Sequence, residues 1–220
     1  MSGSRDQILG RIRSALGDAP RPEVDQTYRA LPRNYLRAHH EHDIVALFAE
    51  RAADYRAVVE RLPAPEVPAA VARILTDRAR DQGARDQGPE AAFVVPDGFP
   101  AEWIPAEITV VRDDPPLSPA QLDRLAGVVT GCAVAIAETG TIVLDHGSAQ
   151  GRRALTLVPD FHLVIVRAEQ VTADLPDAFA RLDPGRPQTL ISGPSATSDI
   201  ELIRVEGVHG PRTLHILLAG

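Results

Sequence analysis

The sequence predicts an α/β protein arranged as a three-layer α/β/α sandwich. Beyond Pro89 the chain consists of short apolar runs, several of them apolar on consecutive positions, as expected for strands buried on both faces. Helical patterns interleave with these runs, which indicates crossovers between parallel strands. The 220 residues, 44% of them hydrophobic, suffice for one sizeable core. We expect that core within residues 41–220, with an N-terminal helix and extended arm over residues 1–40.

The N-terminal segment combines a short amphipathic helix with a proline-containing arm. Residues 4–16 place four apolar side chains at helical spacing: Ile8, Leu9, Ile12 and Leu16. Gly17 ends this helix, and three prolines within residues 18–37 predict an extended arm. Residues 1–40 hold seven arginines and four acidic residues, whereas the remainder holds sixteen and twenty-six. This opposite charge fits an arm that packs on its own domain or on a neighbour's in a homo-oligomer, and it equally fits a solvated arm.

Two helices and a loop are expected before residue 90. Apolar positions predict one long helix over residues 43–62, ended by Pro63, and a second helix over residues 68–80. The tandem repeat of Ala-Arg-Asp-Gln-Gly over residues 79–88 is too charged and too rich in glycine to build a core. We therefore expect the repeat to extend a loop.

Short strands alternate with helices in the remainder of the chain. Strands are predicted over residues 91–95, 108–111, 132–137, 141–144, 155–158, 162–166, 189–191 and 213–218. Helices are predicted over residues 118–128 and 173–182. The turns within residues 138–148 are too short for a crossover helix, so part of the sheet should be antiparallel or carry a hairpin.

The composition excludes several classes of function. The single cysteine, Cys132, provides neither an internal disulfide nor a four-cysteine iron–sulfur site. All 23 basic residues are arginine, so mechanisms that need a Schiff-base, P-loop or general-base lysine are impossible. A formal charge of −7 argues against non-specific binding to nucleic acid. No apolar run reaches the roughly 20 residues of a membrane span, and the polar N-terminus lacks a signal-peptide core, so we expect a cytoplasmic location.

The C-terminal part of the chain offers a candidate anion site. An apolar run gives way to a turn rich in hydroxyl groups, with these candidate ligand-binding residues: Ser192, Gly193, Ser195, Thr197 and Asp199. The pattern predicts a strand, a turn and a helix start, where unpaired backbone N–H groups favour a phosphate or a carboxylate. Ser198 and Glu201 match a capping box, which is a structural role. His209 lies between Gly207 and Gly210 in a shaped turn, so His209 is a candidate proton carrier and Gly210 a candidate binding residue.

A second candidate segment lies between two predicted strands: Glu138, Thr139, Gly140 and Thr141. A glutamate at a strand end suits a nucleophile, a general base or a hydrogen-bond acceptor, and the threonine hydroxyls suit an oxyanion. A plain hairpin turn with an exposed glutamate is the alternative interpretation. Arg152 and Arg153 suit a bidentate clamp on an anion, or else a solvated pair.

The remaining histidines are interpreted mainly as residues without a catalytic role. His39, His40 and His42 lack the four well-spaced ligands of a structural zinc site, so no metal site is predicted. His146 suits an acid or base, or else a loop position without a role, whereas His162 and His215 fit positions in the core or at a sheet edge.

Four motifs occur in order along the C-terminal part of the chain. They are Ala-Glu-Thr-Gly-Thr at 137–141, Pro-Asp-Phe-His-Leu-Val-Ile-Val at 159–166, Ser-Gly-Pro-Ser through Asp-Ile-Glu at 192–201, and Gly-Val-His-Gly-Pro with Leu-His at 207–215. Together they resemble the lactate-utilisation (LUD) domain family, and the resemblance covers about residues 90–220.

The resemblance implies a fold related to sugar-phosphate isomerases, CoA-transferases and formyltetrahydrofolate cyclo-ligase. It also implies an accessory subunit of a system that oxidises L-lactate to pyruvate, beside two larger partner subunits that carry iron–sulfur clusters. We therefore expect no cofactor on this chain, and a small anionic metabolite or a partner subunit as its ligand. The alternative is a free-standing isomerase or acyl/CoA-transfer enzyme. In that case Glu138 would act as base or nucleophile, by fold-level analogy with related CoA-transferases, and His209 as proton shuttle.

Overall fold

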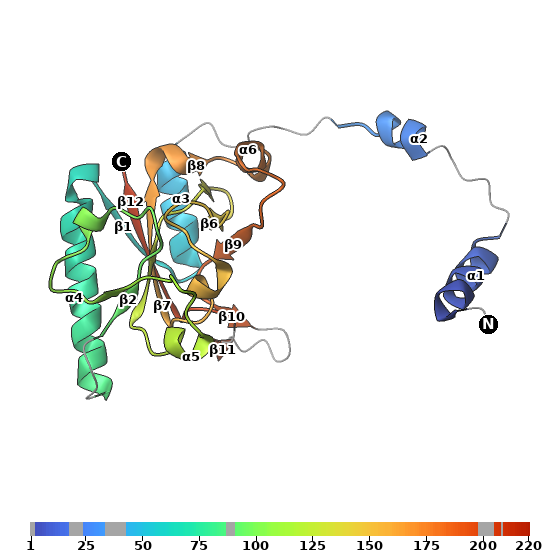
Figure 1. The fold of residues 1–220 in the computed structure, drawn as a ribbon. Coiled ribbons are helices and arrows are strands. Elements are labelled where there is room, and N and C mark those ends of the chain that lie inside the picture. Colours follow the sequence, from blue (N-terminus) through green and yellow to red (C-terminus); the bar gives the residue numbers. More distant parts are fainter. Residues whose placement is uncertain (1–2, 18–23, 34–42, 87–90, 198–204, 208) are drawn as a thin grey trace. The chain divides into compact units, whose positions relative to one another are not determined.

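A computed structural model describes the chain except for residues 1–2, 18–23, 34–42, 87–90, 198–204 and 208. The chain divides into two units, Met1–Leu36 and Arg37–Gly220, and each is described by itself. The first unit contains α1 (Ser4–Leu16) and α2 (Val24–Ala30) (Figure 1). Helix α1 is confirmed as predicted, and it exposes its apolar side chains Ile8, Ile12 and Leu16. Helix α2 lies where we expected an extended arm, because no glycine or proline interrupts its seven residues.

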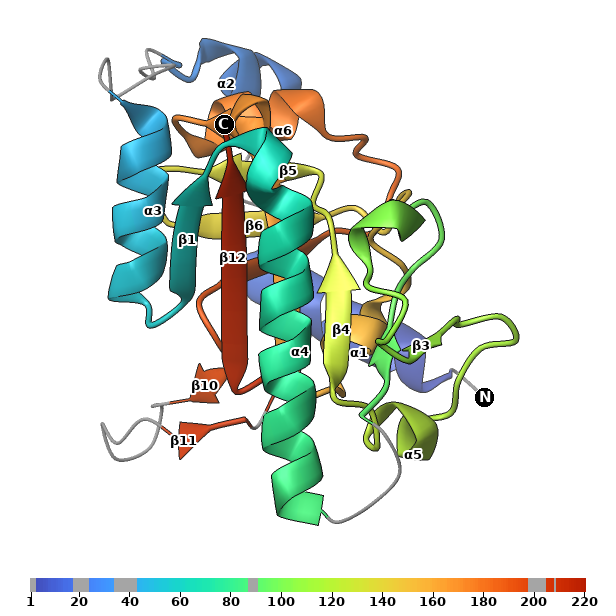
Figure 2. The same cartoon turned by 90° about the vertical axis from the view of Figure 1, so that its left-hand side faces the viewer.

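Six parallel strands form the central sheet of the second unit (Figures 1 and 2). In sheet order they are β1 (Val58–Leu62), β12 (Thr213–Ala219), β7 (Phe161–Arg167), β4 (Gly127–Thr130), β2 (Phe93–Val94) and β3 (Val110–Val111). Parallel pairing places Leu214 of β12 beside His162 of β7. Strand β7 is buried on both faces, as its run of consecutive apolar residues predicts.

A second sheet of four strands holds the antiparallel pairing that the sequence predicts. Its order is β8 (Val171–Thr172), β5 (Val134–Ile136), β6 (Thr141–Leu144) and β9 (Thr189–Ser192). Strands β5 and β6 form an antiparallel hairpin, and β9 pairs antiparallel with β6. The expected hairpin is therefore confirmed, within a sheet of its own. A short antiparallel pair, β10 (Ala196–Thr197) and β11 (Val205–Glu206), completes the described strands.

Each face of the central sheet is covered by a different layer (Figure 1). Helix α4 (Val67–Asp86) covers one face, where its Val71 and Leu75 pack with Leu163 and Leu217 of the sheet. Helix α3 (Ile44–Asp54) and the inner side of the second sheet cover the other face. Helix α6 (Leu175–Arg181) packs on the outer side of the second sheet. The α/β class is confirmed, and the layer opposite α4 combines a helix with a sheet.

The remaining described helices are short. They are α5 (Pro119–Leu122) and the 3-10 helices η1 (Ala64–Glu66), η2 (Ala101–Trp103), η3 (Arg153–Thr156) and η4 (Ala168–Gln170). None of the helices among the described residues is long and apolar enough to span a membrane.

The prediction of one helix over residues 43–62 is wrong in its second half. Helix α3 begins after Asp43, whose carboxylate accepts the Ala46 N–H at 2.9 Å, and ends before Arg56. Arg56 has a φ of +71°, a left-handed conformation that stops a helix. The following residues form β1, which pairs with β12. Two β-branched valines at its start favour this strand.

Three further predictions are corrected by the structure. The strand expected over 155–158 is η3, whose tight turn still buries Leu155. The helix expected over 118–128 stops after α5, and β4 begins at Gly127, where a Cβ atom would lie 2.7 Å from the Phe161 ring. The tandem repeat does not begin as a loop, because α4 continues to Asp86. Residues 87–90 lie outside the described residues.

Candidate functional site

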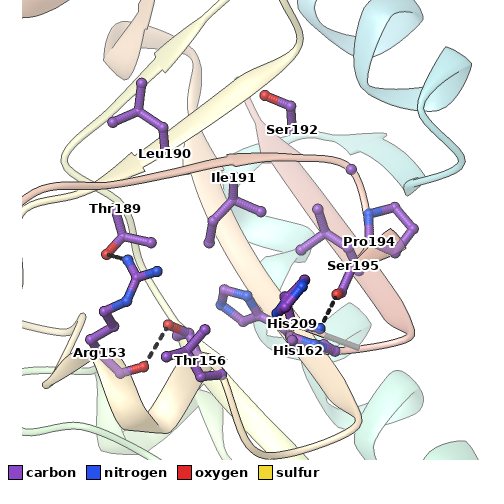
Figure 3. A pocket seen from close by; sticks show the side chains of 15 residues that line it. Arg153, Thr156, His162, Thr189, Leu190, Ile191, Ser192, Pro194, Ser195 and His209 are labelled. Carbon is purple, nitrogen blue, oxygen red and sulfur yellow. Dashed lines mark hydrogen bonds between the residues drawn. The ribbon is translucent and has the colours of Figure 1, made fainter. Parts of the chain in front are cut away.

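A pocket of about 240 Å³ lies at the amino ends of β7 and β12 (Figure 3). Its walls come from η3, which contributes Arg153 and Thr156, and from β7, which contributes His162. Strand β9 and the turn after it add residues 189–195, and the loop before β12 adds residues 209–211. We call this cavity the Arg153 pocket. It brings together six of the predicted site residues: Arg153, Ser192, Gly193, Ser195, His209 and Gly210.

A chain of hydrogen bonds holds the Arg153 side chain at the wall of this pocket. Its Nη1 donates to Thr189 Oγ1 at 2.9 Å (Figure 3). The same hydroxyl lies 3.0 Å from His146 Nε2, and His146 Nδ1 lies 2.9 Å from the Gly151 carbonyl oxygen. Because a carbonyl only accepts, Nδ1 carries the proton and Nε2 accepts from Thr189. The Thr189 hydroxyl thus accepts from Arg153 and donates to His146, and it holds Nη1 of the guanidinium.

A buried histidine closes the pocket from the side of the central sheet. His162 is 1% exposed, and its Nε2 lies 2.7 Å from Thr130 Oγ1 of β4. Burial lowers the pKa of His162 to about 3. The imidazole is therefore neutral near pH 7, and it offers hydrogen bonds rather than a positive charge.

The turn after β9 is tied to the loop before β12. The Ser195 N–H donates to the Pro211 carbonyl at 2.8 Å, and Ser195 Oγ accepts the His209 N–H at 2.9 Å (Figure 3). The Gly207 N–H donates to the Ser195 carbonyl at 3.0 Å. Ser195 therefore positions the loop that presents the exposed His209 side chain at the rim of the pocket.

The two predicted turns meet through a row of hydroxyl groups. Thr139 Oγ1 lies 2.7 Å from Thr141 Oγ1, which in turn lies 2.8 Å from Ser192 Oγ. The pairing of β6 with β9 sets Thr141 directly opposite Ser192. Gly140 and Gly193 both press against the end of α3, where an added Cβ atom would lie 2.5 Å from a backbone atom of Ala52 or Tyr55. The two glycines therefore have a packing role.

The structure does not bring Glu138 into the Arg153 pocket. Glu138 and Thr139 line a separate, wide depression of about 560 Å³ beside the end of α3, together with Arg51, Asp54 and Tyr55. Gly140 and Thr141 do not line the Arg153 pocket either. Glu138 and His209, which were expected to act as base or nucleophile and as proton shuttle of one enzyme, therefore line two separate cavities.

Arg152 points away from its neighbour and forms a structural ion pair. Its Nε donates to Asp113 Oδ2 at 2.6 Å, and its Nη2 donates to Asp113 Oδ1 at 3.0 Å and to the Leu117 carbonyl at 2.6 Å. Burial alone would raise the pKa of Asp113, but hydrogen bonds from Arg152 and from the Leu117 amide lower it overall. The predicted clamp of two arginines on one anion is thus replaced by Arg153 alone.

Of two further predicted ligand residues, the structure describes Thr197 and not Asp199. Thr197 belongs to β10, and the chain enters this short strand where we expected it to approach a helix. Asp199 lies outside the described residues, and so does the expected capping box of Ser198 and Glu201.

Comparison with known proteins identifies the family. A family model described as LUD domain matches residues 120–219. The chain is also 44% identical to Lactate utilization protein C of Deinococcus radiodurans, over 97% of this chain and 94% of that protein. The chain belongs to the LUD domain family. A second LUD domain relative, Lactate utilization protein C of Geobacillus kaustophilus, is 35% identical over half of each chain.

A solved structure shares the fold of this LUD domain protein. It is the crystal structure of a DUF162 family protein from Deinococcus radiodurans, with a TM-score of 0.65 and 40% sequence identity. The similarity covers 81% of this chain and 97% of that one.

Sequence reasoning missed three side chains that shape the pocket of this LUD domain protein. His146 has a φ of +58°, and the Asp-His-Gly turn that follows β6 was the available signal for a special position. Thr189 and Thr156 are buried polar residues whose hydroxyl groups form hydrogen bonds. Nothing in their sequence context distinguishes them from ordinary threonines.

The chemistry that the pocket offers is that of a small anion site. Arg153 supplies a positive charge, and His162, His209 and several hydroxyl groups supply hydrogen bonds. No aspartate or glutamate lines the pocket within the described part of the chain. Among those same residues, no group of three or more potential metal ligands occurs.

Proposed function

We propose that this LUD domain protein works in lactate utilisation by binding a small carboxylate in the Arg153 pocket. The observation that carries the proposal is the Arg153 guanidinium, which Thr189 holds in a pocket whose described lining has no carboxylate, on a chain of net charge −7. An anion that enters is attracted by the arginine without local repulsion from the described walls. The relative named Lactate utilization protein C supports lactate or pyruvate as the carboxylate.

The other groups of the pocket suit an oxygen next to the carboxylate. A neutral His162 and the hydroxyl of Thr156 offer both donors and acceptors. Lactate carries a hydroxyl and pyruvate a carbonyl at that position, and both fit a cavity of about 240 Å³. We propose that the chain acts as an accessory subunit, in the cytoplasm, with electron transfer on iron–sulfur partner subunits. The sequence supports this division, because its single Cys132 cannot hold a four-cysteine cluster.

Binding is tested by calorimetric titration of the purified chain with L-lactate and pyruvate. Saturable binding is expected, and Arg153→Gln should weaken it at least tenfold because a charge-assisted hydrogen bond is lost. Arg124→Gln is the matched control, since Arg124 is an exposed arginine away from the pocket. Equal affinities of Arg153→Gln and the wild type would refute the assigned pocket.

The accessory role needs a separate test. A tagged chain expressed in its own host during growth on lactate should co-purify with iron–sulfur subunits, and deletion of its gene should abolish growth on lactate as the sole carbon source. Unimpaired growth of the deletion strain would contradict the role in lactate utilisation.

The alternative enzyme of isomerase or acyl-transfer type has less support from the geometry. Glu138 and His209 line different cavities, so they do not form a common centre for proton transfer. Glu138→Gln should accordingly leave binding of lactate and pyruvate unchanged.

A further inference from the structure

Two cavities lie at the carboxyl edge of the central sheet, opposite the edge that bears the Arg153 pocket. One has a volume of about 350 Å³ and is lined by Asp97, Asp113 and Gly147 among others. The other has a volume of about 290 Å³ and is lined by Trp103 and Arg167 among others. Gly98 and Ser148 line both cavities, so the two cavities adjoin. We call them together the edge groove and each of them a lobe.

The edge groove lies where the course of the chain reverses across the sheet. Strands β2 and β4 are neighbours, and all six strands run in the same direction. After β2 the chain passes through η2, which packs with α4, and reaches β3 on one side. After β4 it passes into the second sheet, on the opposite face, and returns as β7 on the other side. Loops that diverge in this way leave a crevice, and open α/β sheets bind ligands there.

The loops around the groove are joined by backbone hydrogen bonds. The Ala149 N–H donates to the Asp97 carbonyl, and the Gly131 N–H donates to the Ala149 carbonyl, both at 2.8 Å. Between the lobes Gly98 has a φ of +82°, and an added Cβ atom would lie 1.9 Å from Ser148 Oγ. These contacts connect the loops after β2, β4 and β6, so the groove is a built feature with a backbone floor.

The two lobes differ in chemistry. In the smaller lobe the rings of Phe99 and Trp103 meet edge to face, with centroids 5.8 Å apart, beside the Arg167 side chain. Such a lobe suits a flat heteroaromatic ring. In the larger lobe both carboxylate oxygens of Asp113 are bonded to Arg152, and Asp97 presents an exposed carboxylate. A carboxylate in this position accepts hydrogen bonds from sugar hydroxyls.

We propose that the edge groove binds a nucleoside, with the base beside Trp103 and the ribose hydroxyls at Asp97. The site is separate from the Arg153 pocket and does not depend on the function proposed for that pocket. A nucleoside fits better than a polyphosphate, because the exposed Asp97 carboxylate would repel phosphate groups in the larger lobe.

Trp103 provides the test, since it is the only tryptophan of the chain. Titration of the full chain with adenosine should change the tryptophan fluorescence saturably. Adenine, which lacks the ribose, should bind about tenfold more weakly, because it loses hydrogen bonds to a charged acceptor. In Asp97→Asn this difference should shrink to about twofold, whereas Asp123→Asn, an exposed carboxylate outside the groove, should keep it.

Any of three results would overturn the proposal. They are no saturable change of Trp103 fluorescence with adenosine, equal affinity for adenine and adenosine, or equal behaviour of Asp97→Asn and Asp123→Asn. The variant Arg153→Gln separates the two sites, because it should bind adenosine like the wild type. A chain that binds adenosine and not lactate would support the edge groove and refute the Arg153 pocket, and the reverse result would do the opposite.

Discussion

The substitution Gly140→Ala tests the packing role of the turn between β5 and β6. Gly140 has a φ of +58°, and an alanine there costs roughly 1–2 kcal/mol for the left-handed backbone alone. The new Cβ atom would also lie 2.5 Å from the Ala52 nitrogen and 2.6 Å from the Arg51 carbonyl carbon. These are backbone atoms of α3, so either the helix or the turn must shift. Such an overpacked contact lowers the free energy of unfolding by roughly 1–3 kcal/mol. The free energy of unfolding should fall by about 3 kcal/mol.

Urea denaturation followed by circular dichroism measures this loss. Gly140→Asn separates the two causes, because asparagine tolerates the left-handed conformation but still carries a Cβ atom. If the contact with α3 dominates, asparagine should cost nearly as much as alanine. Gly185→Ala is the matched control: its Cβ atom would meet only the Asp183 carboxylate, at 3.2 Å, and stability should change by less than about 0.5 kcal/mol. A cost below about 1 kcal/mol for Gly140→Ala would refute the packing argument.

Three further predictions concern single side chains. Thr189→Val should weaken lactate binding about tenfold with little change in shape, because Arg153 and His146 both lose their shared partner; unchanged affinity in calorimetry would contradict the network. Cys132 is buried, and burial raises its pKa to about 12, so a thiol reagent at pH 8 should label it only after unfolding in urea. The buried His162, with its pKa lowered to about 3, stays neutral when folded but is protonated when unfolded below pH 6.5. Stability should therefore decrease from pH 6.5 toward pH 3, by up to about 1.4 kcal/mol per pH unit, and His162→Gln should flatten this part of the urea-midpoint profile.

Strands buried on both faces could be predicted from the sequence, and edge elements could not. Consecutive aliphatic residues define β6 and β7 almost to the residue, because few other environments accept such runs. The sequence predicts a helix across the residues of β1, because Glu60 and Arg61 break the apolar pattern of a strand. Its strand conformation depends on pairing with β12, which no local pattern reveals. The predicted helix over residues 118–128 similarly runs past Gly127. A glycine is needed there because Phe161 of a distant strand leaves no room for a Cβ atom, and no local pattern shows this contact.

The site was predictable in its parts but not in their grouping. The sequence predicted both hydroxyl-rich turns as candidate ligand sites, and the structure sets Thr141 of one opposite Ser192 of the other. It could not show that Glu138, in the turn between β5 and β6, lies beside α3, because the pairing of β6 with β9 decides which side chains share a cavity. Arg152 and Arg153 are identical in sequence context. Only the tertiary positions of Asp113 and Thr189 separate a structural ion pair from a group that faces a ligand.

The place of β12 between β1 and β7 also constrains how the protein is made. Among the described strands, β1 lies at the edge of the sheet and pairs with β12 alone. Its Glu60 reaches His215, 155 positions later, through a hydrogen bond of 2.8 Å. During synthesis β1 emerges long before β12 and must wait for it, because loop closure over such a distance precedes any gain from pairing. The nascent chain thus exposes an unpaired strand until β12 has been synthesised. A ribosome that stalls before β12 is complete should release a chain that chaperones and proteases recognise.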